Sequence, residues 1–539
     1  MDYSAVESDV LVIGGGAAGL RAAAEAARKG ARTLLVAKTA VSRAAATTLA
    51  GGGFAGSVGG TTMEKHLAVT KQDGRGLNDP RLLGVMVKRA PEFLHELIAA
   101  SDLAKVDRGR IRFAGPMRVW GLSVALALEK MAKEAGAQAR GHVVILDLLI
   151  RNGRVSGALG YDRKTGEFVL LGTGAVVLAT GGGGAAYLRT DNPSRTVGDG
   201  YALASRAGAA LRDMEFVQFF PLGAAETGRK AYMLPPALAD EARLVNSRGE
   251  NILAKYGIDV KPAAVRCRDQ LSIAMFREAL MGNDVDGAML LDTRDMTDEQ
   301  WSSNPISSSM RGFLESRYGC RDRPIPTFPT CHFWMGGVVI DESGATEIPG
   351  LYAAGEVTGG VHGANRMGGN ALTETVVYGA LAGASAAAFA VGSPRPPLES
   401  SELDARRQWL EKLRTRPLSA DATPSGIRHE VSRILWSHVG IVRNETGLNT
   451  ALEALERLYR DALPRMAVRR PHEVMEAAEA ENLLEVARMV ATAALRRRES
   501  RGAHYREDFP SPDDGRWLCS LFLRRRGESV EIEEISLNP

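Results

Sequence analysis

A glycine-rich turn near the start of the chain places the strongest constraint on the fold. The apolar run 10–13 enters Gly14-Gly15-Gly16-Ala17-Ala18-Gly19, and an alanine-rich helical segment, residues 20–29, follows. A G-x-G-x-x-G turn between a strand and a helix lets the backbone approach a pyrophosphate, and the helix N-terminus offers unpaired N–H groups. The sequence therefore predicts a dinucleotide-binding site built on this strand–turn–helix unit.

The second predicted strand, residues 33–36, lacks the acid that usually follows it in an NAD-binding site. Ala37 and Lys38 stand there instead. NAD sites normally place a carboxylate on the ribose hydroxyls at this point. The sequence therefore disfavours a simple NAD dehydrogenase. An adenosine held by backbone groups, as in some flavoproteins, remains open.

Length and charge exclude some classes of partner. With 539 residues the chain is long enough for several domains and a large core. Its formal net charge of +3 is small for this size, so nucleic acid is not expected as a partner. Arginine runs occur at 496–498 and 524–526. We interpret them as solvated faces or as a docking surface for an acidic neighbour.

Four cysteines are scattered along the chain without C-x-x-C spacing: Cys267, Cys320, Cys331 and Cys519. This pattern predicts neither an iron–sulfur cluster nor another metal site, so a one-electron relay would need another subunit. We expect a reducing, cytoplasmic setting, with no signal peptide. The apolar stretch 379–392 is too short to span a bilayer, so no direct membrane span is expected.

The order of strand-like and helix-like segments predicts an α/β fold with insertions. We expect a Rossmann-like dinucleotide-binding domain with an inserted α+β capping domain and a C-terminal helical domain. The dinucleotide-binding domain would take residues 1–225 and 330–396, the cap 226–329 and the helical domain 400–500. Residues 501–539 read as a polar, irregular tail. Further segments of the first domain are a hairpin-like passage at 144–171 and strands at 175–179, 337–340 and 350–354.

Four widely separated motifs span nearly the whole chain. They are the N-terminal turn with Lys38 and residues 48–53; residues 179–182 with Gly198-Asp199-Gly200 and residues 214–216; Gly355-Glu356 with residues 362–372; and residues 498–504. Together they resemble the flavoprotein subunit family of succinate dehydrogenase and fumarate reductase, which includes L-aspartate oxidase. Several members of this family carry a small residue before the lysine, which accounts for the missing ribose acid.

The resemblance implies an extended FAD. Respiratory members attach FAD to a histidine, but Ala44-Ala45-Ala46 stand at that place and no histidine precedes His66. We therefore expect non-covalent FAD. The implied cofactor-binding residues are Gly14, Gly16, Ala18, Gly19, Lys38, Gly51, Gly52, Ala179, Thr180, Gly181, Asp199, Glu356, Arg366, Asn370, Ala371 and Leu372.

The resemblance also implies three catalytic residues. Family enzymes transfer a proton with an arginine of an R-D motif, here Arg268-Asp269. Arginine is an unusual acid, because its pKa normally keeps it protonated. It suits this role because a carbanion beside a carboxylate is a strong base. His332, in a segment similar to the family H-Y-x-M-G-G, and Arg366 would hold the substrate carboxylate.

The chain departs from the family where dicarboxylate-specific members bind the second carboxylate. Their Q-F-H-P reads Gln218-Phe219-Phe220-Pro221 here, and their T-E-G-x-R-G-E-G-G is absent from residues 232–249. A carboxylate facing Phe220 would be buried without a partner, at a cost of several kcal/mol. We therefore expect a carboxylate or thioester substrate with an apolar far end, not a simple C4 dicarboxylate.

Three hypotheses for function follow. The first is an FAD-dependent dehydrogenase or reductase, the flavin subunit of a complex whose partner carries iron–sulfur clusters and docks on the helical region and arginine-rich tail. The second is a stand-alone amino-acid oxidase resembling L-aspartate oxidase. The third is a flavoprotein that only relays electrons, which would not need Arg268, His332 and Arg366.

Overall fold

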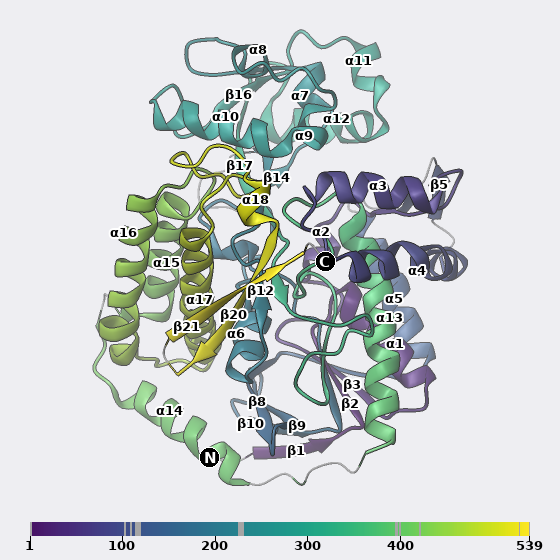
Figure 1. The fold of residues 1–539 in the computed structure, drawn as a ribbon, viewed down its shortest axis with the longest axis vertical. Coiled ribbons are helices and arrows are strands. Elements are labelled where there is room, and N and C mark those ends of the chain that lie inside the picture. The colour runs from purple at the N-terminus through teal and green to yellow at the C-terminus, as the bar shows by residue number, and fades with distance from the viewer. Residues whose placement is uncertain are drawn as a thin grey trace.

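A computed structural model gives the fold of the chain (Figure 1). It describes residues 3–101, 104–107, 110–113, 120–224, 231–393, 397, 400–419, 422–527 and 529–537. The domain boundaries expected at 225/226 and at 396 lie outside the described residues.

Five parallel strands form the central sheet, in the order β19-β11-β2-β3-β7. Their bounds are β2 Val10–Ile13, β3 Thr33–Ala37, β7 Gln138–Gly141, β11 Ala175–Leu178 and β19 Leu351–Ala353. All but β7 are buried along their length, as expected for parallel strands covered on both faces. This sheet confirms the expected Rossmann-like domain.

Helices and a second sheet pack around the central sheet. Helix α1 (Ala17–Arg28) packs against α5 (Trp120–Glu134) and α13 (Asn370–Val391). The second sheet contacts β3 and β11 and has the order β1-β10-β9-β8. Its strands are β1 Tyr3–Glu7, β8 Val143–Arg151, β9 Arg154–Asp162 and β10 Phe168–Gly172. The hairpin expected at 144–171 corresponds to the antiparallel strands β8, β9 and β10.

Smaller elements complete this domain. They are α2 Ala46–Leu49, β4 Gly53–Ala55, α3 Met63–Asp73, α4 Pro80–Ala99, β5 Ala104–Asp107, β6 Arg110–Phe113, α6 Asp199–Arg206, β12 Leu211–Arg212 and β18 Gly337–Val338. Helix α4 begins at Pro80 because Asp79 accepts hydrogen bonds from two N–H groups of its first turn.

Among the described helices, α13, which contains most of the apolar stretch 379–392, is long and apolar enough to cross a membrane by length and composition alone. The helix runs for 22 residues and begins nine residues before the apolar stretch considered above. Over half of its most apolar window, 56%, is buried inside the protein. Because α13 packs against α1 and α4, its apolar composition is that of a core helix.

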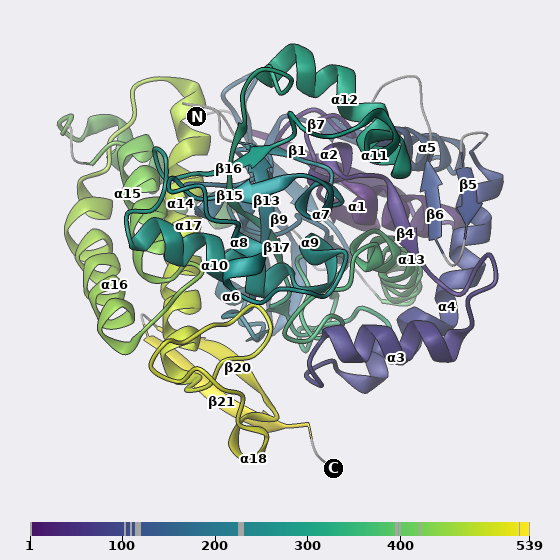
Figure 2. The ribbon, with the colours of Figure 1, turned by 90° about the horizontal axis from the view of Figure 1, so that it is seen from above.

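The capping domain sits at the top of Figure 1 and lies over the dinucleotide-binding domain in Figure 2. Its sheet has the order β14-β13-β17-β16-β15. The strands are β13 Val217–Ala224, β14 Tyr232–Met233, β15 Arg243–Val245, β16 Met289–Asp292 and β17 Ile325–Trp334. The helices are α7 Leu238–Glu241, α8 Ile252–Lys255, α9 Ala263–Arg266, α10 Arg268–Leu280, α11 Asp298–Ser303 and α12 Pro305–Tyr318. Strands β13 and β17 lead into and out of the cap.

Four helices form the C-terminal helical region at the left of Figure 1: α14 Asp404–Thr415, α15 Pro424–His438, α16 Glu445–Arg457 and α17 Pro471–Arg496. Helix α17 packs against α15, α16 and α6, so it joins this region to the first domain. Its central residues are buried around most of the helix, which is typical of a core helix.

The last residues are not the irregular tail that the sequence analysis expected. After the short helix α18 (Asp514–Trp517), strands β20 (Cys519–Arg526) and β21 (Ser529–Ser536) form an antiparallel hairpin. Strand β20 also pairs with β12 of the dinucleotide-binding domain. The polar composition of this segment suggested irregular structure. It is instead explained by a strand with one solvated face, because β21 alternates between exposed and half-buried residues.

Candidate active site

A groove runs along the carboxyl ends of β2, β3 and β11 and holds about 1030 Å³ of empty space, part of it open to solvent. Such grooves at strand ends are where open α/β sheets bind ligands. The structure brings nine of the predicted cofactor-binding residues to this groove: Gly14, Gly16, Ala18, Lys38, Ala179, Thr180, Gly181, Asp199 and Glu356.

The glycine turn has the geometry that a pyrophosphate site needs. Gly14 has φ +127°, and a Cβ on Gly19 would lie 1.9 Å from the Gly14 carbonyl oxygen. Gly19 therefore serves close packing of α1 on the turn and does not line the groove. Gly16, the N-cap of α1, has no side-chain cap; the Ala17 N–H donates to Thr47 Oγ1 at 3.0 Å, so an anion would meet the next N–H groups of the first turn.

The other residues of the groove also fit a dinucleotide. The hydroxyl of Thr180 is buried, lines the groove and has no hydrogen-bond partner among the described residues. A buried polar group in that state is expected to bind a ligand or water. Ala44, Ala45 and Ala46, which the resemblance placed at the position of a flavin-linked histidine, line the same groove.

Lys38 is held by two carboxylates where the ribose acid is missing. Its ammonium pairs with Asp199 and, at 3.0 Å, with Oε1 of Glu479. Burial opposes the charge, but the two acids raise the pKa of Lys38 above its usual value. Lys38 is therefore a fixed cation on the wall of the groove.

Glu356 lies where the groove meets the capping domain. Its Oε1 accepts a hydrogen bond from the backbone N–H of Trp334 at 3.1 Å. A Cβ on Gly182 would lie 2.3 Å from the same oxygen, so Gly182 makes room for the carboxyl group. Burial raises the pKa of Glu356 to about 7.

The remaining predicted cofactor residues do not line the groove; besides Gly19 they are Gly51, Gly52, Arg366, Asn370, Ala371 and Leu372. Gly369 (φ +94°) ends the turn before α13, and the last three residues form the first turn of that helix. The Asn370 side chain points toward α3, where it bonds to His66 Nε2 at 2.8 Å and Thr70 Oγ1 at 2.9 Å. Only backbone groups of this turn remain for a ligand.

The cap brings Arg268 and Arg366 together at one acceptor. Gln218 Oε1 accepts from Arg268 Nη1 at 2.6 Å and from Arg366 Nη2 at 3.0 Å. Both guanidinium groups are buried, and no carboxylate of a described residue lies within 4 Å of either. Burial and the charge of Arg268 lower the pKa of Arg366 to about 9. Gln218 was not singled out from the sequence as a site residue.

His332 and Phe220 lie beside this pair. Asp191 Oδ2 bonds to His332 Nδ1 at 2.8 Å, which leaves Nε2 for a ligand. Burial lowers the pKa of His332, which favours the neutral ring. The ring of Phe220 lies 5.7 Å from the imidazole and 5.9 Å from the Arg268 guanidinium. Asp191 is a further residue that the sequence analysis missed.

The segment 232–249 supplies no acid to this site. Asp240 accepts hydrogen bonds from the backbone N–H of Ala263, and Glu241 accepts one from Ser303. Both carboxylates are thus used inside the cap.

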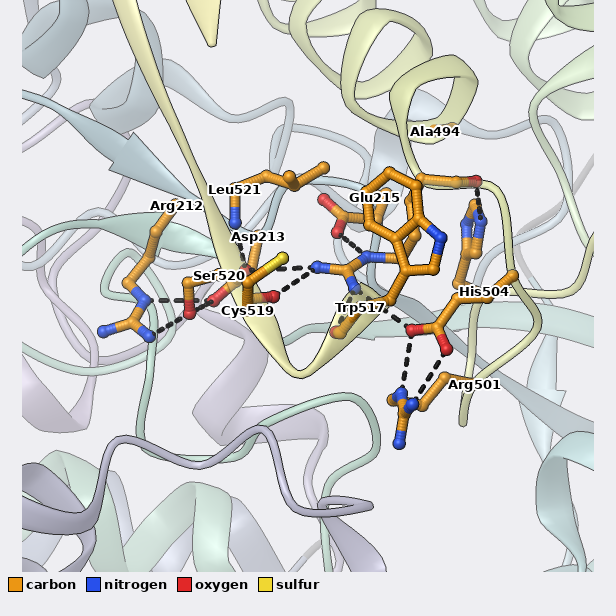
Figure 3. Close-up of polar contacts among 12 residues, drawn as sticks. Arg212, Asp213, Glu215, Ala494, Arg501, His504, Trp517, Cys519, Ser520 and Leu521 are labelled. Carbon is orange, nitrogen blue, oxygen red and sulfur yellow. Dashed lines mark hydrogen bonds and ion pairs between the residues drawn. The ribbon is translucent and has the colours of Figure 1, made fainter. Parts of the chain in front are cut away.

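A buried polar network joins the C-terminal motif to residues 212–215, which lie just before β13 (Figure 3). Arg497 is fully buried and pairs with Glu215 at 2.6 Å and Glu499 at 3.1 Å. Gly502 and Ala503 pack against Ala364, whose oxygen accepts from Ala503 N–H at 2.9 Å. The interpretation of the run 496–498 as a solvated face was therefore wrong for Arg497. Its charge is neutralised inside the protein.

The groove and the buried arginine pair have the residues that a dinucleotide and an anion would need, and comparison with known proteins gives the class. Residues 9–372 match a family model described as FAD binding domain, and residues 428–539 match one described as fumarate reductase flavoprotein C-term. The chain belongs to the succinate dehydrogenase and fumarate reductase flavoprotein family, and it is an FAD-dependent oxidoreductase.

Relatives match along nearly their whole length. A fumarate reductase (CoM/CoB) subunit of Methanothermobacter marburgensis is 34% identical and is matched over 98% of this chain and 99% of its own. The L-aspartate oxidase of Streptomyces coelicolor is 33% identical and is matched over 96% of this chain and 92% of its own. The solved structure of Mycobacterium smegmatis Sdh1 in complex with UQ1 superposes with a TM-score of 0.89 at 29% identity, covering 99% and 95%.

Glu356→Gln should stabilise the FAD-free protein at high pH but not at low pH. Because the folded pKa of Glu356 is about 7 and the ordinary value is 4.5, its stabilising contribution is complete below about pH 4.5. This contribution is lost as pH rises through 7, and a pKa shift of this size corresponds to a loss of about 3 kcal/mol in the free energy of unfolding. The difference in thermal midpoint between variant and wild type should grow from pH 5 to pH 8. Glu453→Gln, at an exposed site on α16, is the control. A difference in thermal midpoint between Glu356→Gln and wild type that does not change with pH would contradict the raised pKa of Glu356.

Proposed function

We propose that the protein exchanges hydride between FAD and a substrate that carries one carboxylate or thioester group and is not a simple C4 dicarboxylate. One observation carries the proposal. Two buried guanidinium groups share the neutral oxygen of Gln218, at 2.6 and 3.0 Å, and neither has a carboxylate partner among the described residues.

The charge balance of this pair favours an anionic ligand. A buried cation is costly unless an anion and further hydrogen bonds satisfy it. Nε of Arg366 is buried and has no hydrogen-bond partner in the described part of the chain. A substrate carboxylate would supply the missing negative charge and accept from this nitrogen in a forked pair. Its binding would also raise the pKa of Arg366 above the value of about 9.

FAD, when bound, would supply the hydride acceptor or donor. The protein's part is to hold the substrate and move a proton at the neighbouring carbon. A Cβ on Gly368 would lie 3.9 Å from Arg268 Nη2, so this nitrogen lies at the turn that precedes α13. Burial lowers the pKa of Arg268, which makes its guanidinium a better proton donor than in water. His332, oriented by Asp191, would orient the carboxylate.

Phe220 supports an uncharged far end for the substrate. Its side chain is 2% exposed, its ring lies near both His332 and Arg268, and it belongs to the apolar core of the cap. An aromatic ring can pack against an apolar group but has no donor for a second carboxylate. This geometry supports an enoate or enoyl thioester over succinate and fumarate.

Arg268→Lys should lower substrate turnover by at least a thousandfold and leave flavin content unchanged. Lysine keeps the charge but loses the planar fork and the contact with Gln218. The measurement is anaerobic flavin reduction or reoxidation by stopped flow, with flavin content from the absorption spectrum. Arg266→Lys, on α9 of the same cap, is the control. Normal turnover in Arg268→Lys would contradict the proposed role of Arg268 as the proton donor.

A panel of enoates, enoyl thioesters, amino acids and C4 dicarboxylates tests substrate class. We expect oxidation of the reduced flavin by an enoate or enoyl thioester and slow reaction with fumarate. Phe220→His adds a donor beside His332 and should raise kcat/KM for fumarate at least tenfold relative to wild type. Brisk turnover of fumarate by the wild type would overturn the proposal. Peroxide formation with amino acids would favour the oxidase alternative, to which the 33% identical L-aspartate oxidase gives weight.

We also propose that FAD is bound non-covalently and that the chain works with an iron–sulfur subunit in the cytoplasm. Alanines at 44–46 support the first point. The partner is supported by a relative that is named as a subunit. The four cysteines are free and buried, which suits a reducing compartment and leaves no ligands for an iron–sulfur cluster on this chain. The isolated chain should accept electrons from its physiological donor slowly. Full turnover without a partner, with a soluble donor or acceptor, would contradict the partner proposal.

A further inference from the structure

Glu479, in the first half of α17, is a buried carboxylate that contacts residues of the groove wall from the helical region. It is fully buried and pairs with three cations from separate segments. Its distances are 3.0 Å to Lys38 Nζ, 2.8 Å to Arg195 Nη1 and 2.8 Å to Arg428 Nη1. Lys38 and Arg195 line the groove, whereas Glu479 does not.

The next turn of the same helix holds a third charged residue of the groove. Asn482 Nδ2 donates to Asp199 Oδ1 at 2.9 Å, and the other oxygen of Asp199 pairs with Lys38. Residues three apart lie on one face of a helix. One face of α17 thus fixes three charged groups on the groove wall, Lys38, Arg195 and Asp199.

The charges show why this contact matters for the groove. Burial favours the neutral acid, yet Lys38, Arg428 and Arg195 hold the pKa of Glu479 below its usual value. Without that carboxylate, Lys38 would keep only Asp199 and Arg195 only Glu476, and Arg428 would lose the one ion pair it has among the described residues. Removing one partner of a buried ionic cluster leaves charge uncompensated and destabilises the arrangement of the others.

We propose that Glu479 is a positioning residue for FAD, through which docking of α17 and binding of FAD stabilise each other. The helix holds Lys38, Arg195 and Asp199 in the arrangement that the dinucleotide meets, and the dinucleotide in turn favours the docked helix. Such coupling is reciprocal, because the same free energy appears in both directions. The inference depends on the FAD site alone and is independent of the proposed substrate.

The test is FAD affinity of the full-length chain, stripped of flavin and titrated with FAD by flavin fluorescence. Glu479→Gln should raise the Kd at least tenfold. Glu481→Gln is the matched control: Glu481 lies two residues later on the same helix and pairs at 3.0 Å with Arg406, which does not line the groove. It should change the Kd by less than twofold. Equal Kd values for wild type and Glu479→Gln would overturn the proposal.

Hydrogen exchange separates positioning from a general loss of structure. In the wild type, FAD should slow amide exchange in residues 471–496 of α17. In Glu479→Gln, exchange of this helix without FAD should stay near wild type, but FAD should no longer slow it. Undiminished protection by FAD in the variant would contradict the coupling. If Glu479→Gln does not fold, Asn482→Ala tests the same helix face through Asp199, with a several-fold rise in Kd expected and an unchanged Kd counting against the proposal.

Discussion

The buried ion pair between Arg497 and Glu215 holds the start of β13, and the active site is built on that strand. Both side chains are fully buried and lie 2.6 Å apart. Two residues after Glu215, β13 begins, and it carries Gln218 to the two arginines. Removing one member of such a pair typically costs about 3–5 kcal/mol, because the other stays buried and uncompensated. Arg497 thus links the C-terminal region to the segment that leads into the first strand of the cap.

The same C-terminal segment reaches the other half of the site. Gly502 has φ +55°, and a Cβ there would lie 2.4 Å from the oxygen of Ala364, two residues before Arg366. Arg501 donates to the backbone oxygen of Arg75 at 3.2 Å. The motif at 498–504 therefore packs on loops from distant parts of the chain. Its family resemblance has a physical basis in packing, since none of its side chains lines the groove.

The sequence was sufficient where a local pattern carries the information. The glycine turn predicts the strand and the helix on either side of it, and the structure contains both. The orientation of Phe220 toward the substrate stays a prediction; its ring lies 5.7 Å from the His332 imidazole. The sequence was insufficient for ion pairs between residues that are hundreds of positions apart in the chain. Glu479 is 441 residues from Lys38, and no periodicity marks that contact. Arg497 stood in a basic run typical of a solvated face, and only the fold reveals its buried acids.

Gln218 bridges two arginines that belong to different bodies of the molecule. Arg268 begins α10 of the cap, whereas Arg366 precedes α13 of the dinucleotide-binding domain. Before ligand arrives, two positive charges face each other across that seam with one neutral amide between them, and like charges repel. A bound carboxylate, as proposed above, would attract both arginines at once and so join the cap to the dinucleotide-binding domain. Because hydride exchange at the neighbouring carbon leaves that carboxylate intact, substrate and product would join the two domains alike.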